Sequence, residues 1–134
     1  LAGYYFEQQK FDRTIGLLET YVRLKPDDFI GFAKLRQTYF LAGRLREAAG
    51  VCRTLINQNP RNVSRYIEAG VLFERMGLSD SVIAVYEEGL RVDSTFYQLH
   101  RRLGAWYQST GNTGKAVWHL RIADSLAGLS RTAQ

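Results

Sequence analysis

The sequence repeats itself with a period of 34 residues, and no other feature limits its fold so strongly. Pro26 and Pro60 lie one period apart. Three further series share the spacing, one aromatic, one mainly of small residues and one of glycines. Their members are Tyr5, Tyr39, Phe73 and Tyr107; Thr14, Ala48, Val82 and Ala116; and Gly43, Gly77 and Gly111. A fixed period of roughly 20 to 50 residues is typical of arrays in which each unit packs against its neighbours.

The order of these residues resembles the tetratricopeptide repeat, whose pattern runs from an aromatic residue through Leu-Gly, Tyr, Ala and Phe to Pro. Three copies carry most of this pattern. They consist of Phe32, Leu35, Tyr39, Ala48, Cys52 and Pro60; of Tyr66, Ala69, Gly70, Phe73, Val82 and Tyr86; and of His100, Leu103, Gly104, Tyr107, Ala116 and Leu120. An incomplete first copy begins with Leu1, Ala2 and Tyr5. The resemblance implies an all-α, right-handed superhelical solenoid of antiparallel helix pairs, with about three and a half repeats.

We expect one repeat domain over residues 1–127 and a C-terminal tail over 128–134. The repeats are expected near 1–28 (partial), 29–62, 63–96 and 97–130. The pattern predicts a short helix at 1–8, then helices near 12–25, 28–42, 45–58, 62–76, 79–92, 96–110 and 113–127. Gly43, Gly77 and Gly111 mark the ends of the first helices, because glycine can adopt the left-handed conformation that ends a helix. Gln9 stands at this position in the first copy.

Composition restricts the class of protein. The 134 residues are 46% hydrophobic, which is enough for a packed core. No stretch reaches the roughly 18 apolar residues of a membrane-spanning helix, and no signal segment opens the sequence. Cys52 is the single cysteine, which excludes an internal disulfide framework and fits either a cytoplasmic or a periplasmic protein, with the cytoplasm favoured. Because the sequence begins inside a repeat, we expect it to belong to a longer protein.

No group of residues predicts catalysis. The segment 111–115 contains Gly, Thr and Lys, but Ser109 and Ala116 replace the first glycine and the metal-binding hydroxyl of a phosphate loop. His100 occupies an aromatic packing position, and His119 has no Cys, Asp or Glu at helical i+3 or i+4 spacing. We therefore expect no catalytic, cofactor-binding or metal site, and interpret the domain as non-enzymatic.

The net charge of +5 raises the question of nucleic-acid binding. The arginines that would supply it are spread over several predicted helices. They are Arg44, Arg46, Arg61, Arg65, Arg101 and Arg102. This scatter is typical of a solvated surface, so we favour acidic protein partners over nucleic acid.

The resemblance also implies where a partner would bind, because the first helices of tetratricopeptide repeats line a concave groove. The residues expected on this groove are Phe6, Ile30, Ala33, Gln37, Phe40, Leu41, Ile67, Val71, Glu74, Arg75, Gln98, Arg101 and Gln108. The apolar character of its first half favours an apolar or amphipathic peptide, and Arg75 and Arg101 could meet an acidic flank. The alternative is that these apolar residues pack against a first helix that the sequence lacks and against neighbouring repeats.

Trp118 predicts a second contact, at the end of the solenoid. The corresponding positions of the earlier copies hold the small residues Gly16, Gly50 and Ala84. Trp118 could therefore cap the last helix, contact the tail, or meet another subunit. We interpret the chain as a protein-interaction scaffold; the alternative is an assembly, oligomerisation or regulatory domain of a longer enzyme or transcription factor.

Overall fold

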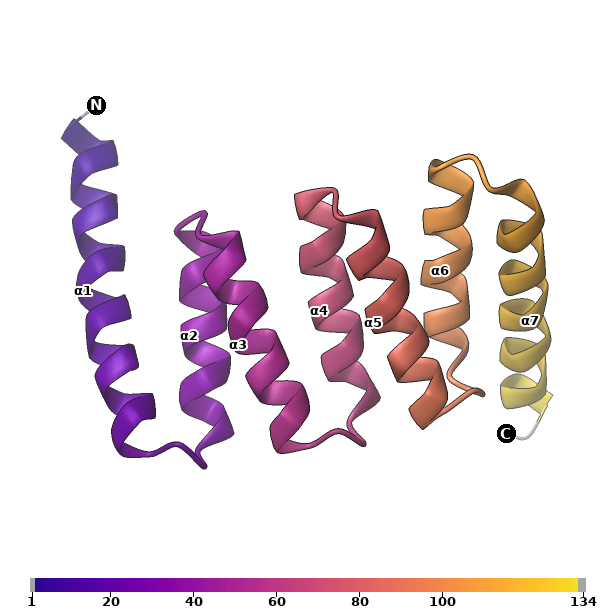
Figure 1. Ribbon diagram of the computed structural model, residues 1–134, viewed down its shortest axis with the longest axis horizontal. Helices are drawn as coiled ribbons and strands as arrows, with labels where there is room; N and C mark the ends of the chain where they lie inside the picture. Colours follow the sequence, from indigo (N-terminus) through magenta and orange to yellow (C-terminus); the bar gives the residue numbers. More distant parts are fainter. Residues whose placement is uncertain (1, 133–134) are drawn as a thin grey trace.

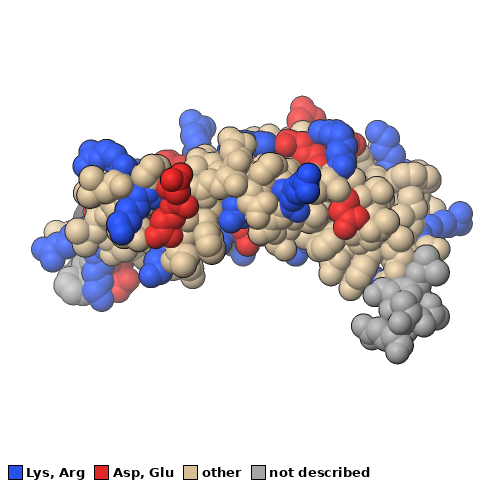
Figure 2. Space-filling view, turned by 90° about the horizontal axis from the view of Figure 1, so that it is seen from below, with Lys and Arg blue, Asp and Glu red and all other residues tan. Residues whose placement is uncertain are grey.

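The computed structural model describes residues 2–132, and within them the side chains of residues 3–4 and 7–128. Seven helices and no strand lie in this part of the chain. They are α1 (Ala2–Leu24), α2 (Phe29–Leu41), α3 (Leu45–Gln58), α4 (Val63–Met76), α5 (Ser79–Val92), α6 (Tyr97–Ser109) and α7 (Thr113–Thr132). Successive helices run antiparallel and side by side (Figure 1), and together they curve into an arch (Figure 2). The predicted all-α solenoid of antiparallel helix pairs is confirmed.

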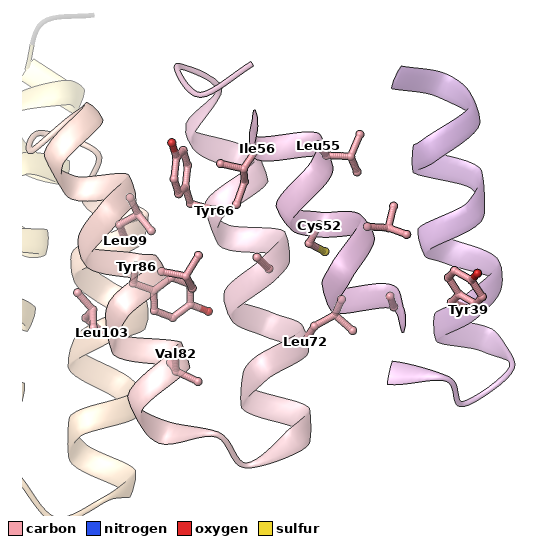
Figure 3. Packing of buried hydrophobic residues seen from close by; sticks show 14 of the residues in the cluster. Tyr39, Cys52, Leu55, Ile56, Tyr66, Leu72, Val82, Tyr86, Leu99 and Leu103 are labelled. Carbon is pink, nitrogen blue, oxygen red and sulfur yellow. The ribbon is translucent and has the colours of Figure 1, made fainter. Parts of the chain in front are cut away.

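Each pair consists of a first helix (α2, α4 or α6) and a second helix (α3, α5 or α7). In the pairs α4–α5 and α6–α7, a glycine of the first helix lets the two helices approach closely. A Cβ added to Gly70 of α4 would lie 2.0 Å from Cε1 of Tyr86 on α5. A Cβ added to Gly104 of α6 would likewise lie 2.7 Å from Cγ of Leu120 on α7. Side chains of successive helices meet in one continuous core (Figure 3). The 34-residue series therefore records the packing of one helix on the next.

The predicted turn glycines end the first helices. Gly43, Gly77 and Gly111 have φ angles of 78°, 69° and 88°, and they are the residues with positive φ in the described chain. A residue with a side chain would lose about 1–2 kcal/mol in this conformation. The glycine series is thus explained by backbone geometry, since none of the three would place a Cβ near another atom.

The expected break near Gln9 is wrong, because α1 is one continuous helix of 23 residues. Gln9 carries a Cβ and so disfavours the left-handed turn that glycine makes in the later repeats. The chain continues in the helical conformation instead. As a result the amino-terminal part of α1 extends beyond α2 (Figure 1) rather than folding back on the rest of the helix.

The last helix also continues further than expected, to Thr132 instead of a residue near 127. Gly128 lies inside it, and no proline follows that would end it. Within the described residues, none of the helices combines the length and the apolar character needed to cross a bilayer.

The close approach at Gly70 leads to a test of the fold. Gly70→Ala is expected to lower the free energy of unfolding by about 3 kcal/mol, near the upper end of overpacking costs, because the Tyr86 ring is fully buried and cannot move aside. Gly50→Ala is the matched control: Gly50 also lies within a helix, its added Cβ would meet nothing within 4 Å, and a gain of about 0.5–1 kcal/mol is expected. Urea denaturation measures both, and similar effects of the two substitutions would contradict this packing role.

Candidate functional site

A cavity of about 500 Å³ opens on the face formed by the first helices. Its walls come from three successive repeats. The lining residues are Arg36, Gln37 and Phe40 of α2; Ile67, Glu68, Val71 and Leu72 of α4; and Arg102 of α6. A site built across three repeats depends on how the repeats stack, since no single helix pair supplies it.

The floor of the cavity is apolar. Ile67 and Val71 lie one turn apart on the same side of α4, and Phe40 faces them from α2. Phe40 and Ile67 are only partly buried, although both pack against the hydrophobic core. Part of each side chain therefore remains available to an apolar group of a ligand.

Two carboxylates near the cavity are already engaged. Glu68 accepts a hydrogen bond from Arg36 at 2.5 Å, which ties α4 to α2. Glu74 accepts a hydrogen bond from the Tyr86 hydroxyl at 2.6 Å, and burial together with this carboxylate raises the pKa of Tyr86. Arg102 forms an ion pair with the same Glu74 oxygen at 3.7 Å, a distance too long for a hydrogen bond. Arg102 can therefore pair with a further carboxylate.

Two more arginines stand over aromatic rings on this face. The guanidinium carbon of Arg75 is 5.1 Å from the centroid of the Phe40 ring, and that of Arg101 is 5.3 Å from the centroid of Tyr97. Such cation–π contacts hold a cation in place at the surface. Neither arginine forms an ion pair within the described chain. Arg75, which stands over Phe40 of the floor, and the lining residues Arg36 and Arg102 make the rim of the apolar floor basic.

The structure places the predicted groove residues in two groups. Gln37, Phe40, Ile67 and Val71 line the cavity. The others described on the first helices lie outside its lining. They are Ile30, Ala33, Leu41, Glu74, Arg75, Gln98, Arg101 and Gln108. The side chain of Phe6 lies outside the described residues.

Sequence reasoning missed four lining residues, Arg36, Glu68, Leu72 and Arg102. For Arg36, the repeat pattern itself contains an indication, because this residue departs from the glycine of the later copies. It occupies the position that Gly70 and Gly104 hold in later copies, where helices approach closely. In this pair the facing residue of α3 is the small Cys52, and the Arg36 side chain lies beside it with only 23% of its surface exposed.

The two histidines, which the sequence places 19 residues apart, form a buried pair between α6 and α7. Nδ1 of His100 lies 3.1 Å from Nδ1 of His119, and Nε2 of His100 lies 2.9 Å from the carbonyl oxygen of Ser94. Because a carbonyl only accepts, Nε2 of His100 donates to Ser94, and in a neutral His100 the Nδ1 atom then accepts from His119. Burial, His100 and Lys115 lower the pKa of His119 to about 4. His119 is thus held in its neutral form.

Aromatic rings enclose this pair. Tyr107 stacks on His119 with ring centroids 5.7 Å apart, and Trp118 meets it edge-on at 4.7 Å. The indole is nevertheless 59% exposed. No group of three His, Cys, Asp or Glu side chains that could hold a metal occurs in the described part of the chain.

No protein-family model and no curated protein matches the chain. Solved structures do match it. MamA MSR-1 shares 24% identity over 94% of this chain and 72% of its own, with a TM-score of 0.72. A crystal structure of MamA shares 20% identity over 88% and 69%, with a TM-score of 0.77, and MamA from Desulfovibrio magneticus RS-1 shares 14% over 89% and 67%, with a TM-score of 0.72. At these identities the likeness establishes the fold, a tetratricopeptide-like helical repeat.

The histidine pair predicts a loss of stability in acid. The unfolded chain takes up the His119 proton near pH 6.5, and the folded chain only near pH 4. Since the unfolded state binds more protons between these values, the stabilisation is complete above about pH 6.5 and falls as the pH drops toward 4, by on the order of 2 kcal/mol.

The measurement is urea denaturation at pH 7.5 and at pH 4.5 for the wild type and His119→Leu. Leucine suits the position, because Leu17, Val51 and Val85 hold it in the other copies. The carboxylates titrate in both proteins, so their contribution cancels. The variant is expected to lose less stability in acid, and an equal loss in both proteins would refute the role of His119.

Proposed function

We propose that this chain is a non-catalytic protein-interaction domain that binds a peptide or helix of a partner protein in the groove along α2, α4 and α6. One observation carries the proposal, the cavity whose apolar floor and basic rim come from three successive repeats. Helical repeats commonly present such extended surfaces to partners. The fold shared with the MamA structures is consistent with this use.

The shape and charge of the groove indicate the ligand. A cavity of about 500 Å³ can accept one or two large side chains, and Phe40, Ile67 and Val71 would surround them with apolar surface. Arg75 and Arg102 stand beside this floor and would attract a carboxylate that follows or precedes the apolar anchor. The favoured ligand is an amphipathic segment with an apolar anchor and an acidic flank.

A second candidate function, assembly or regulation within a longer protein, is favoured by Trp118. A tryptophan that is 59% exposed on the last helix is a feature of contact surfaces. Trp118→Glu would then reduce a concentration-dependent mass measured by sedimentation. The groove function predicts no effect of this substitution on partner capture.

Affinity capture from the lysate of the source organism tests the groove. The wild type is expected to retain a partner that the Phe40→Glu, Ile67→Glu double variant loses, because two carboxylates at these partly buried positions would replace the apolar surface of the floor. Arg75→Glu, an exposed change that leaves the core untouched, should weaken capture several-fold. Mass spectrometry identifies the bound protein.

Ala84→Glu is the matched control, since Ala84 is exposed on the second helix α5. It introduces the same charge away from the groove and should leave capture unchanged. Thermal unfolding by circular dichroism confirms that each variant is folded. Capture of the same proteins by all variants would exclude the groove as the binding surface.

A further inference from the structure

Four arginines in the described part of the chain stand over aromatic rings. Two of them also have polar partners. Arg44 forms an ion pair with Glu47, and Arg65 donates a hydrogen bond to a backbone carbonyl oxygen of α3. The other two, Arg75 of α4 and Arg101 of α6, have neither a hydrogen bond nor an ion pair with the described residues. We call these two the free arginines, and both belong to first helices.

The ring beneath each free arginine holds its guanidinium in place. The guanidinium carbon of Arg75 lies 5.1 Å from the centroid of the Phe40 ring on α2. That of Arg101 lies 5.3 Å from the centroid of Tyr97, one turn earlier on α6. Arginine can donate two parallel N–H groups to a carboxylate, and a ring contact restrains the guanidinium without using an acidic partner. Each free arginine is therefore a receptor for a carboxylate that is positioned before a ligand arrives.

The two free arginines lie far apart along the helices. Arg101 occupies the repeat position of Ile67, and Arg75 occupies that of Ser109. These positions are eight residues apart within one repeat, which is about 12 Å along a helix axis. The rings increase this separation, because the ring beneath Arg75 lies on α2 and the ring beneath Arg101 lies closer to the start of α6. One carboxylate cannot bind both arginines while they remain over their rings.

The apolar floor of the cavity lies between the free arginines. Ile67 stands at the level of Arg101 along the helices. Val71 follows one turn later, and Phe40 corresponds to the residue before Arg75. An apolar group on this floor would therefore have one free arginine toward each end of it.

The other charges of this face do not cancel the free arginines. Glu68 is paired with Arg36. Glu74 accepts a hydrogen bond from a tyrosine hydroxyl of α5 and pairs with Arg102. Lys34, exposed at the repeat position of Glu68 and Arg102, adds a further positive charge. The face is thus positive overall, and the carboxylates it holds are already engaged.

We propose that the groove selects a segment of a partner protein with two acidic residues, one on each side of its apolar anchor, and that each free arginine binds one of them. This inference rests on the proposed function and adds a second acidic flank to its ligand. The separation of the free arginines sets the spacing. The two acidic residues must lie at least about four residues apart in an extended segment, or about eight in a helix.

Charge and position distinguish this ligand from other occupants. A second copy of the chain carries the same net charge of +5 and would be repelled. A nucleic acid would bring phosphates over the apolar floor and against Glu68 and Glu74. Additional repeats would extend the row of helices beyond α1 or α7 and leave this face open. A partner segment with acidic residues on both sides of an apolar anchor matches the floor and both free arginines.

Three synthetic peptides test the spacing. The two-ended peptide carries two glutamates at each end of the core Ser-Leu-Phe-Leu-Ser, the one-ended peptide carries all four glutamates before this core, and the neutral peptide has glutamines in place of the glutamates of the two-ended peptide. Acetyl and amide groups remove the terminal charges. Isothermal titration calorimetry with the full chain is expected to show about fivefold tighter binding of the two-ended than of the one-ended peptide. The neutral peptide should bind most weakly, and the differences should shrink in high salt.

Neutral substitutions identify the residues responsible. Arg75→Gln and Arg101→Gln should each weaken binding of the two-ended peptide about fivefold and remove its advantage over the one-ended peptide. Binding of the neutral peptide should not change. Arg46→Gln is the matched control, because Arg46 is exposed on the second helix α3 and its loss removes the same charge. It should change binding of all three peptides less than about twofold.

The ring beneath Arg75 has a separate test. Phe40→Leu keeps an apolar side chain in the floor but removes the aromatic ring. It should weaken binding of the two-ended peptide more than binding of the neutral peptide, because only the former uses Arg75. Equal weakening of both would show that Phe40 acts through the floor alone and does not position Arg75. Circular dichroism checks that each variant is folded.

The outcomes separate this inference from the proposed function. Saturable binding that is equal for the two-ended and one-ended peptides, or an equal loss in Arg46→Gln and Arg75→Gln, would overturn the inference and leave the groove function standing. Absence of saturable binding of all three peptides at millimolar concentration would overturn both. Tighter binding of a single-stranded oligonucleotide that Arg75→Gln and Arg101→Gln abolish would make a nucleic acid the occupant, and a dimer that Arg75→Gln dissociates in sedimentation would make it a second copy.

Discussion

The close contact of a first helix with its own second helix is the interaction on which the structure depends. At Gly70 and Gly104 the absence of a side chain lets Tyr86 and Leu120 pack directly on the opposing backbone. An amphipathic helix of 13 or 14 residues, the length of α2 to α6, gains little stability alone and needs such a partner. A helix–helix contact recurs every 34 residues, and it builds a row of helices with one continuous hydrophobic core between them.

This packing also determines which side chains are left for binding. Each first helix uses one side for its second helix, so the remaining side faces the groove. There Ile67 and Val71 form the floor, and the ion pair of Arg36 with Glu68 links the walls of successive repeats. An outer ion pair, in which Arg53 contacts Glu88 at 2.9 Å, links α3 to α5 in the same way. The groove and the stacking of the repeats therefore depend on the same geometry.

Helix α1 is the exception to this paired arrangement. Without glycine at position 9 the chain does not turn, and α1 becomes a second helix that has no first helix beside it in the described chain. Leu17 is exposed, whereas Val51 and Val85 at the same position of the repeat are buried. All three side chains are apolar, so the difference comes from the helix that covers Val51 and Val85 and has no counterpart over Leu17 in the described chain. The ends of the solenoid thus present surfaces that its interior repeats bury, which is a general consequence of linear stacking.

The sequence by itself determined the helix pairs, the turn glycines and the buried positions, because each of these follows from a local signal that recurs every 34 residues. Tertiary structure alone decided the contacts between residues distant in the sequence. The pairing of His100 with His119 and the meeting of Phe40, Ile67 and Arg102 around one cavity depend on how neighbouring helices cross. The continuity of α1 at Gln9 depends on a balance between a strained turn and a longer helix, which the repeat pattern did not reveal. Local preferences specify helices and turns, whereas a site between helices exists only once they are packed.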